Sequence, residues 1–358
     1  MGEYDMAMDI YTSALKQAEL NGDKRGIGSS LHNIGNIYYR KGEYDQALDH
    51  YNPSLKIMEE LGDKSGIGGG LNSIGIIYGM KGDYDKTLDY FNRFLKISEE
   101  LGDKSNIGAS LNNIGALYKR KGEYDQALDY FSRALKLSEE LGDKNEIGRS
   151  LNSIGAIHWG KGEYDQALDY FSRSLEIREE LGDKNGIGEC INNMGIIHWG
   201  KGELDQALDY FSRALKISEE LSDKSGIGTS LNNIGIYYYL KGECEKAVEY
   251  LEKSLHIQQE IGKKGLELFT TTHLYLANKQ LDKAYNEQEI HRLIKEDENI
   301  EFEINFRLYE LLEDKSYLET AYNQIQEKAD VMDDELKEKF LNYPIPKAII
   351  GKYNSVRT

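Results

Sequence analysis

Two glycine-rich segments come close to a phosphate-binding loop, the motif that would hold a nucleotide. They are Gly155–Gly162 and Gly195–Gly202, and each contains a Gly-Lys pair. Both lack the Ser or Thr that should follow this lysine and bind magnesium. A third segment, Gly66–Gly68, begins like a dinucleotide-binding loop, but Leu71 replaces the glycine that the motif needs. We therefore expect neither a nucleotide nor another cofactor.

Other side chains with chemical potential recur at a fixed interval, which is not how a single active site is built. His158 and His198 lie 40 residues apart, and no third ligand recurs with them. Because a zinc site needs three or four ligands, packed core histidines are expected there instead. Carboxylate pairs such as Glu59–Glu60 also recur, whereas a catalytic pair would be a single exception. We expect no catalytic residue and no metal site.

The composition excludes several classes of partner. Lys and Arg number 44 against 62 Asp and Glu, so the net charge is −18. This argues against a nucleic-acid partner, because such a protein needs a basic face. No apolar run approaches the ~18 residues of a membrane-spanning helix, and the acidic N-terminus lacks the apolar core of a signal peptide. We expect no membrane partner and a cytoplasmic location.

One segment repeats through most of the chain. Lys-Gly-Glu-Tyr-Asp-Gln-Ala-Leu-Asp starts at Lys41, Lys121 and Lys161, and near copies start at Lys81, Lys201 and Lys241, always at multiples of 40 residues. Six full copies fit between about residues 21 and 262. A glycine column runs through them at Gly2, Gly42, Gly82, Gly122, Gly162, Gly202 and Gly242. The 36 glycines against 3 prolines therefore indicate a recurring structural role rather than loops.

Each repeat reads as two helices. The first carries apolar and small residues at spacings of three and four, which makes one buried face: Leu31, Ile34, Gly35, Ile37 and Tyr38. Gly42 should end this helix and Gly62 the second one, both as left-handed C-terminal residues. Position 35 should be where the paired helices approach closely. A pair this short cannot bury its apolar face alone, so neighbouring repeats must stack.

This spacing resembles the tetratricopeptide repeat. The residues that carry the resemblance are Leu31, Gly35, Tyr38, Ala47, Tyr51 and Ser54. The usual unit has about 34 residues and a proline where Glu59 stands here, so this 40-residue form is more similar to Leu-Gly-Asn-type adaptors and kinesin light chain. The resemblance covers residues 2–296. It implies an all-α fold, a right-handed α-α superhelix of antiparallel helix pairs with a helical C-terminal cap.

Both ends depart from the repeat. Phe302, Phe306, Tyr309 and Leu312 suit a helix, although Ile300–Phe306 also alternates as a strand would; we choose helix because Leu308 and Leu311 continue the helical period. Residues 316–342 should also be helical, and Pro344 and Pro346 should stop that stretch. The expected domains are a half repeat at 1–24, six repeats at 25–262, a degenerate repeat at 263–297 and a helical cap at 298–358.

The resemblance implies that the first helices line a concave groove that binds peptides. Several of its columns vary among otherwise similar repeats, as specificity positions would, although neutral drift on an exposed face would look the same. A row of asparagines could pair with an extended peptide backbone, or belong to the repeat scaffold. The amides expected in the groove are those of Asn72, Asn112, Asn152, Asn192, Asn193 and Asn232.

Aromatic and charged side chains complete the expected groove. Trp159 and Trp199, the only tryptophans, lie one repeat apart with Tyr239 next, and could anchor an apolar side chain or pack between helices. Lys119, Arg120 and Arg149 place positive charge on the same face, with Glu189 beside them in the variable columns. A partner with acidic residues beside an apolar or aromatic anchor would suit this arrangement.

These features predict a non-enzymatic adaptor that holds an extended segment of a protein partner. One alternative is a regulatory arm of a bacterial-type signalling enzyme, linked to a cyclase or kinase, because the array begins mid-repeat and the Phe340–Pro346 segment loosely resembles the tails of such proteins. A third is self-association through an apolar edge of the N-terminal helix.

Overall fold

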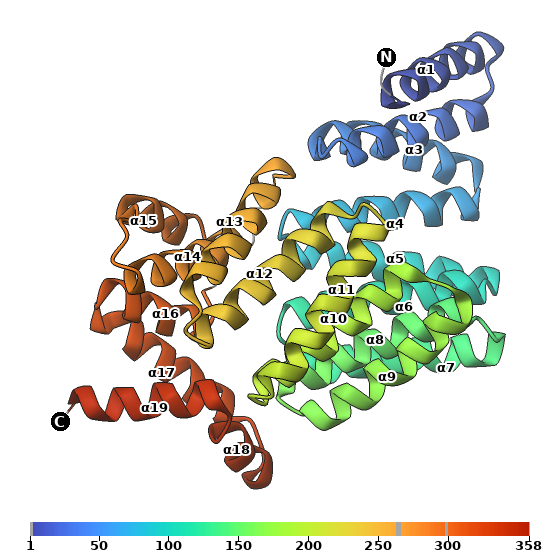
Figure 1. Ribbon diagram of the computed structural model, residues 1–358. Coiled ribbons are helices and arrows are strands. Elements are labelled where there is room, and N and C mark those ends of the chain that lie inside the picture. Colours follow the sequence, from blue (N-terminus) through green and yellow to red (C-terminus); the bar gives the residue numbers. More distant parts are fainter. Residues whose placement is uncertain (1–2, 263–265, 298–299, 358) are drawn as a thin grey trace. The chain divides into compact units, whose positions relative to one another are not determined.

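The computed structural model describes residues 3–262, 266–297 and 300–357. Gly2, expected to end a helix, lies outside them. Every regular element of the described residues is helical, and none of these helices is long and apolar enough to cross a membrane. The helices, labelled in Figure 1, are α1 (Glu3–Asn21), α2 (Lys24–Arg40), α3 (Tyr44–Leu61), α4 (Lys64–Met80), α5 (Tyr84–Leu101), α6 (Lys104–Arg120), α7 (Tyr124–Leu141), α8 (Lys144–Lys161), α9 (Tyr164–Leu181), α10 (Lys184–Gly200), α11 (Leu204–Glu220), α12 (Lys224–Leu240), α13 (Cys244–Glu260), α14 (Glu267–Gln280), α15 (Glu287–Glu296), α16 (Phe302–Leu312), α17 (Lys315–Asp330), α18 (Asp334–Leu341) and α19 (Pro344–Arg357).

The chain divides into an N-terminal unit, residues 1–157, and a C-terminal unit, residues 158–358. In the N-terminal unit the first helices α2, α4 and α6 pair with the second helices α3, α5 and α7, and α3 and α5 also pack on the next first helices, α4 and α6. In the C-terminal unit α10 pairs with α11 and α12 with α13 in the same way. The fold is therefore an all-α array of helix pairs, as the sequence predicts.

Capping residues fix where each helix begins and ends. Asp63 precedes α4 and accepts a hydrogen bond from the Gly66 backbone N–H at 3.2 Å, and equivalent aspartates cap α2, α6, α10 and α12. Gly62 ends α3 with φ 65°, and Gly42 follows α2 with φ 77°. These positive angles favour glycine, and they confirm the predicted role of the two glycine columns.

The two helices of a repeat approach most closely at a glycine of the first helix. A Cβ added to Gly75 would lie 2.7 Å from a ring carbon of Phe91 on the paired helix, and one on Gly195 would lie 2.6 Å from Phe211. Real carbon atoms do not approach this closely, so a side chain here would force the pair apart. The prediction that this glycine column is a packing feature is confirmed.

Replacing Gly75 by alanine should destabilise the N-terminal unit by about 1–3 kcal/mol, because the new methyl group overlaps the Phe91 ring. Gly69→Ala is the matched control: Gly69 lies on the same helix, is exposed, and its new Cβ would meet nothing within 4 Å. It should be neutral or stabilising by up to ~1 kcal/mol through helix propensity. Urea melts of both variants measure the difference, and equal stabilities would contradict the close approach.

After α14 the chain leaves the repeat pattern and folds back on earlier helices of the C-terminal unit. α16 packs against both α14 and α17. Tyr343 stacks on Tyr164 at the start of α9, with ring centroids 4.6 Å apart, and Lys339 donates a hydrogen bond to Asp165 at 2.5 Å. The C-terminal segment therefore does more than cover the end of the array, because it also reaches the start of α9.

The helical interpretation of Phe302–Phe306 is confirmed, since these residues form the first turns of α16. Every residue from 304 to 308 is buried, which explains why a strand-like alternation was also visible. Residues 315–330 and 334–341 are helical, and this stretch ends before Pro344 as expected, but a further helix follows at once. Pro344 begins α19, where its missing N–H is tolerated because the first residues of a helix have no intrahelical acceptor.

His273 of α14 is the most deeply buried titratable side chain of this packing. Its Nδ1–H donates to the Phe269 carbonyl oxygen at 2.9 Å, and Nε2 has no hydrogen-bond partner within the part of the chain that the structure describes. Burial, with a smaller contribution from the charge of Arg307 on α16, lowers the pKa of His273 from 6.5 to about 3. The imidazole is therefore neutral in the folded protein near neutral pH.

Stability should consequently fall as the pH drops from about 6.5 towards 4.5, because the unfolded chain binds a proton on His273 that the folded chain does not. The slope from this residue is at most about 1.4 kcal/mol per pH unit. His273→Phe should flatten the curve in this window, and His291→Phe, at an exposed histidine of α15, should not. Urea melts across the pH range measure both; an unchanged slope in His273→Phe would show that the ring is accessible to protons.

Candidate functional site

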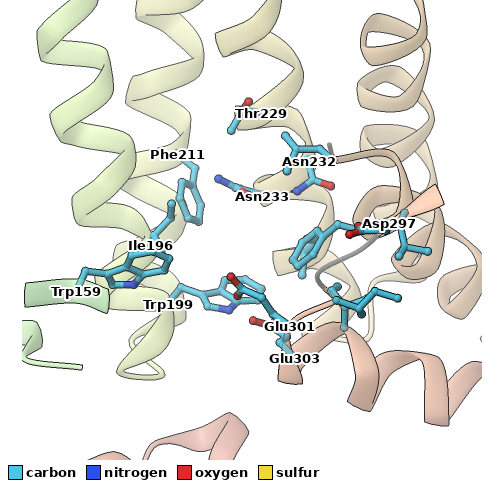
Figure 2. A pocket seen from close by; sticks show the side chains of 16 residues that line it. Trp159, Ile196, Trp199, Phe211, Thr229, Asn232, Asn233, Asp297, Glu301 and Glu303 are labelled. Carbon is cyan, nitrogen blue, oxygen red and sulfur yellow. Dashed lines mark hydrogen bonds between the residues drawn. The ribbon is translucent and has the colours of Figure 1, made fainter. Parts of the chain in front are cut away.

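A pocket of about 380 Å³ lies within the C-terminal unit, on the face formed by its first helices. α10 contributes Ile196 and Trp199, and α12 contributes Thr229, Asn233 and Ile236. These residues recur at spacings of three and four along each helix, so they lie on one face. Figure 2 shows side chains of both helices converging on the same space.

The remaining walls come from the degenerate repeat and the C-terminal segment. Leu268 and Phe269 stand at the start of α14, and Ile304 lies in the first turn of α16. Trp159 adds an indole that is 39% exposed. Most of the lining is therefore apolar and aromatic, as in sites that bury part of a ligand.

The side-chain amides of Asn232 and Asn233 form one wall of the pocket, and hydrogen bonds to other side chains fix their orientation. Asn232 is only 2% exposed, and its Oδ1 accepts a hydrogen bond from Thr270 Oγ1 at 2.8 Å. Its Nδ2 donates to Asn233 Oδ1 at 3.3 Å, and Asn233 Nδ2 donates to Asn192 Oδ1 at 3.2 Å. This chain of amides fixes the orientation of Asn233 towards the pocket.

Three carboxylates line the opposite side, from Asp297, Glu301 and Glu303. In Figure 2 the side chains of Glu301 and Glu303 lie beside the Trp199 indole, and the Trp199 N–H donates to Glu303. Burial raises the pKa of the Glu303 carboxyl, Arg307 lowers it in part, and Glu301 raises it further. The pocket therefore joins aromatic walls to a desolvated acidic edge.

Three of the residues expected in the groove line this pocket: Trp159, Trp199 and Asn232. Asn192 stands behind Asn233, and Asn193 is half-buried on the same helix, α10. The expectation of an exposed aromatic row is wrong at Tyr239, which is 7% exposed and meets His273 edge to face at 6.0 Å. The degenerate repeat explains this, because α14 packs over the end of α12.

The asparagines expected in the N-terminal unit bond to neighbouring repeats. Asn72 Oδ1 accepts from Asn113 Nδ2 at 2.7 Å, and Asn112 Nδ2 donates to Glu146 Oε2 at 3.2 Å. Asn152 is buried, at 7% exposure. These bonds between successive first helices support a scaffold role for the amides beside any role in binding.

The charged side chains expected in the groove are exposed, and three of them bond locally. Arg120 donates to the Gly79 carbonyl oxygen at 3.2 Å, Arg149 pairs with Glu146 at 3.0 Å, and Glu189 faces Arg178 at 3.6 Å. Lys119, at the end of α6, also takes part in an interaction within the chain. The positive charge predicted for this face is therefore partly offset by the chain itself.

The glycine-rich segment of α10, the two cysteines and His198 are buried or bonded within the chain. Gly195–Gly200 lies inside helix α10, whose backbone N–H groups are used within the helix. Burial raises the pKa of the Cys190 and Cys244 thiols, which favours the unreactive form. His198 Nδ1 bonds to Glu203 at 2.5 Å and its ring stacks on Tyr210. No group of three or more metal-ligating side chains occurs among the described residues.

The acidic edge of the pocket was missed by the sequence analysis. Asp297, Glu301 and Glu303 follow the last recognisable repeat and belong to no column of it. The available signal was the high density of acids between Glu296 and Glu303. Only the return of the chain after α15 brings Glu301 and Glu303 next to Trp199.

The sequence matches one family model, described as tetratricopeptide repeat, over residues 1–60, 69–140, 106–180, 146–220 and 189–260. No curated protein matches the chain in sequence.

Solved structures with similar folds share little sequence with the chain. Aspartyl phosphate phosphatase F from Bacillus subtilis is 14% identical with a TM-score of 0.57, covering 99% of this chain and 94% of its own. The Rap conjugation gene regulator of plasmid pLS20, solved with the Phr* peptide, is 13% identical with a TM-score of 0.58, covering 99% and 96%. The STAND protein PH0952 from Pyrococcus horikoshii, which has a tetratricopeptide repeat sensor, is 17% identical with a TM-score of 0.57, covering 98% of this chain and 53% of its own.

Proposed function

Because the chain belongs to the tetratricopeptide repeat family, we propose that it is a non-catalytic interaction protein. Its first helices hold an extended segment of a partner protein, and one side chain of that segment enters the pocket between α10, α12, α14 and α16. The observation that carries this proposal is the pocket itself. It lies on the predicted binding face and contains both tryptophans of the chain.

The size and lining of the pocket suit a side chain of a peptide. A volume of about 380 Å³ is at the lower end of the ~300–1,000 Å³ typical of ligand sites. Aromatic walls from Trp159 and Trp199 offer a large contact area for an anchor, and interface energy concentrates in such anchors. The Asn233 amide can bond to the peptide backbone beside the anchor.

The structures with similar folds support the proposal that this chain binds a peptide. The Rap regulator of plasmid pLS20 was solved in complex with a peptide, and it shares the fold over nearly the whole chain. Another neighbour is named as a phosphatase, but the cysteines, histidines and carboxylate pairs of this chain have structural partners. The acidic partner expected from Lys119, Arg120 and Arg149 stays a prediction for the N-terminal unit.

Selection of binders from a displayed random-peptide library tests the proposal. Wild type should enrich related sequences, and Thr229→Phe should reduce their affinity about tenfold or more, because the new ring fills the pocket. Trp199→Ala should have a similar effect by removing one wall. Affinities are measured by titration of the enriched peptides.

Leu141→Ala is the matched control, since Leu141 is an exposed apolar residue outside the pocket. It should leave the affinities unchanged. Thermal melts show whether each variant is folded. Enrichment of peptides whose affinity is the same for wild type and folded Thr229→Phe would contradict the role of the pocket.

A second candidate function is a sensor arm of a signalling enzyme. The STAND protein from Pyrococcus horikoshii supports it, because this chain covers only 53% of that longer protein, whose name includes a tetratricopeptide repeat sensor. In that case the pocket would receive the signal and a separate domain would perform the catalysis. Sequencing of the gene upstream of the Met1 codon distinguishes the two functions, since a continuous reading frame into a catalytic domain is expected only for the second.

The N-terminal helix supports self-association as a third candidate. Met6, Ile10 and Leu20 of α1 are 56%, 64% and 77% exposed, so this helix presents apolar side chains to solvent. Light scattering over a range of concentrations should show a mass that rises with concentration, and Ile10→Glu should remove the rise. A constant monomer mass for wild type would exclude this candidate.

A further inference from the structure

We propose that the pocket selects a cationic side chain, a lysine or arginine of the bound segment. This inference rests on the proposed peptide-binding function and adds the chemistry of the anchor. The sequence analysis expected a partner with acidic residues, whereas the anchor proposed for this pocket is positively charged.

The first argument is the charge of the lining. Asp297, Glu301 and Glu303 all reach the pocket, and no Lys, Arg or His is among the described residues that line it. The Glu301 and Glu303 carboxylates repel each other, and the apolar walls lower the local dielectric, which strengthens this repulsion. A bound cation would relieve it.

The second argument is an unsatisfied acceptor. Glu303 Oε1 is buried and has no hydrogen-bond partner in the described parts of the chain. The Trp199 indole N–H is the side-chain donor that reaches this carboxylate. A buried acceptor without a hydrogen bond destabilises the folded protein, and more so when it is charged. An N–H of a guanidinium or ammonium group would supply the missing bond.

The cations already present lie behind the carboxylates and do not line the pocket. Arg307 acts on Glu303 but donates its Nη1–H to Glu310 at 2.7 Å. Lys328 of α17 acts on Glu301 while its ammonium lies over the rings of Phe302 and Phe340. Neither supplies positive charge on the side that a ligand would occupy.

The third argument is the shape of the ligand that the walls select. Trp159, Trp199 and Phe211 offer ring faces and Ile196 an aliphatic surface around the acidic edge. Lysine and arginine combine an apolar stem with a charged end, and a cation over an indole face gains further attraction. A glutamate would meet the carboxylates, and a leucine would leave Glu303 Oε1 unpaired.

The two tryptophans of the chain both line the pocket, so selectively excited tryptophan fluorescence reports its occupancy directly. The probes are blocked Gly-Xaa-Gly tripeptides in which Xaa is arginine, lysine, citrulline, leucine or glutamate. Citrulline has nearly the shape of arginine without its charge. The arginine and lysine peptides should bind with dissociation constants about tenfold or more below that of the citrulline peptide. Higher salt should reduce this difference between the dissociation constants, because it screens the charges.

Glu303→Gln keeps the shape of the side chain and removes its charge, and should weaken binding of the arginine peptide about tenfold. Glu301→Gln changes an exposed residue and should weaken binding of the arginine peptide about threefold. This second variant keeps the test valid if Glu303→Gln fails to fold. Glu219→Gln is the matched control, since it removes one exposed acid of α11 in the same unit and should change nothing.

Tighter binding of the arginine and lysine peptides that depends on Glu303 or Glu301 would support the inference. If the leucine, citrulline or glutamate peptide binds as tightly as the arginine peptide, the inference is overturned. The proposed function would then still stand, provided that Thr229→Phe blocks these peptides and library-selected sequences. If no tripeptide of any class changes the fluorescence, the inference also fails, and failure of the library selection as well would overturn the proposed function.

Discussion

The structure depends on how closely the two helices of each repeat can approach. A first-helix glycine such as Gly75 or Gly195 lets an aromatic ring of the second helix lie directly on its backbone. This contact brings the paired helices together. Because the pairs are nearly identical, the first helices within each unit present the same face, and side chains on that face can act together.

The pocket is a consequence of breaking this regularity. Where repeats continue, asparagines of successive first helices bond to one another, as Asn113 does to Asn72. After α12 the repeat decays, and the chain returns across the degenerate helix α14 through α16. The returning segment cannot reproduce the repeat contacts, and a space remains beside Trp199 that a ligand can enter.

The acidic side of the pocket also results from the end of the repeat pattern after α12. Within the repeats, acids and bases pair across neighbours, as Lys184 does with Glu220 at 2.7 Å, so most charges have a partner at a fixed distance. Glu301 and Glu303 lie outside that pattern, and no Lys, Arg or His is among the described residues that line the pocket beside them. The proposed anchor chemistry therefore arises from the part of the chain that the repeat does not govern.

The sequence by itself determined the helix pairs, their ends and their close contacts, since each depends on residues near in sequence: glycines with positive φ at 42 and 62, and a small residue at 75 facing the ring at 91. The periodic pattern also put Trp159, Trp199 and Asn232 on one side of the first helices, the side that the family resemblance predicts for binding. The tertiary structure alone decided that Tyr239 is buried, that Pro344 begins a helix, and that Glu301 and Glu303 meet Trp199. These three features depend on where the non-repeating C-terminal segment packs on helices far earlier in the sequence, as Tyr343 does on Tyr164. The spacing of residues within one helix carries no information on such long-range contacts.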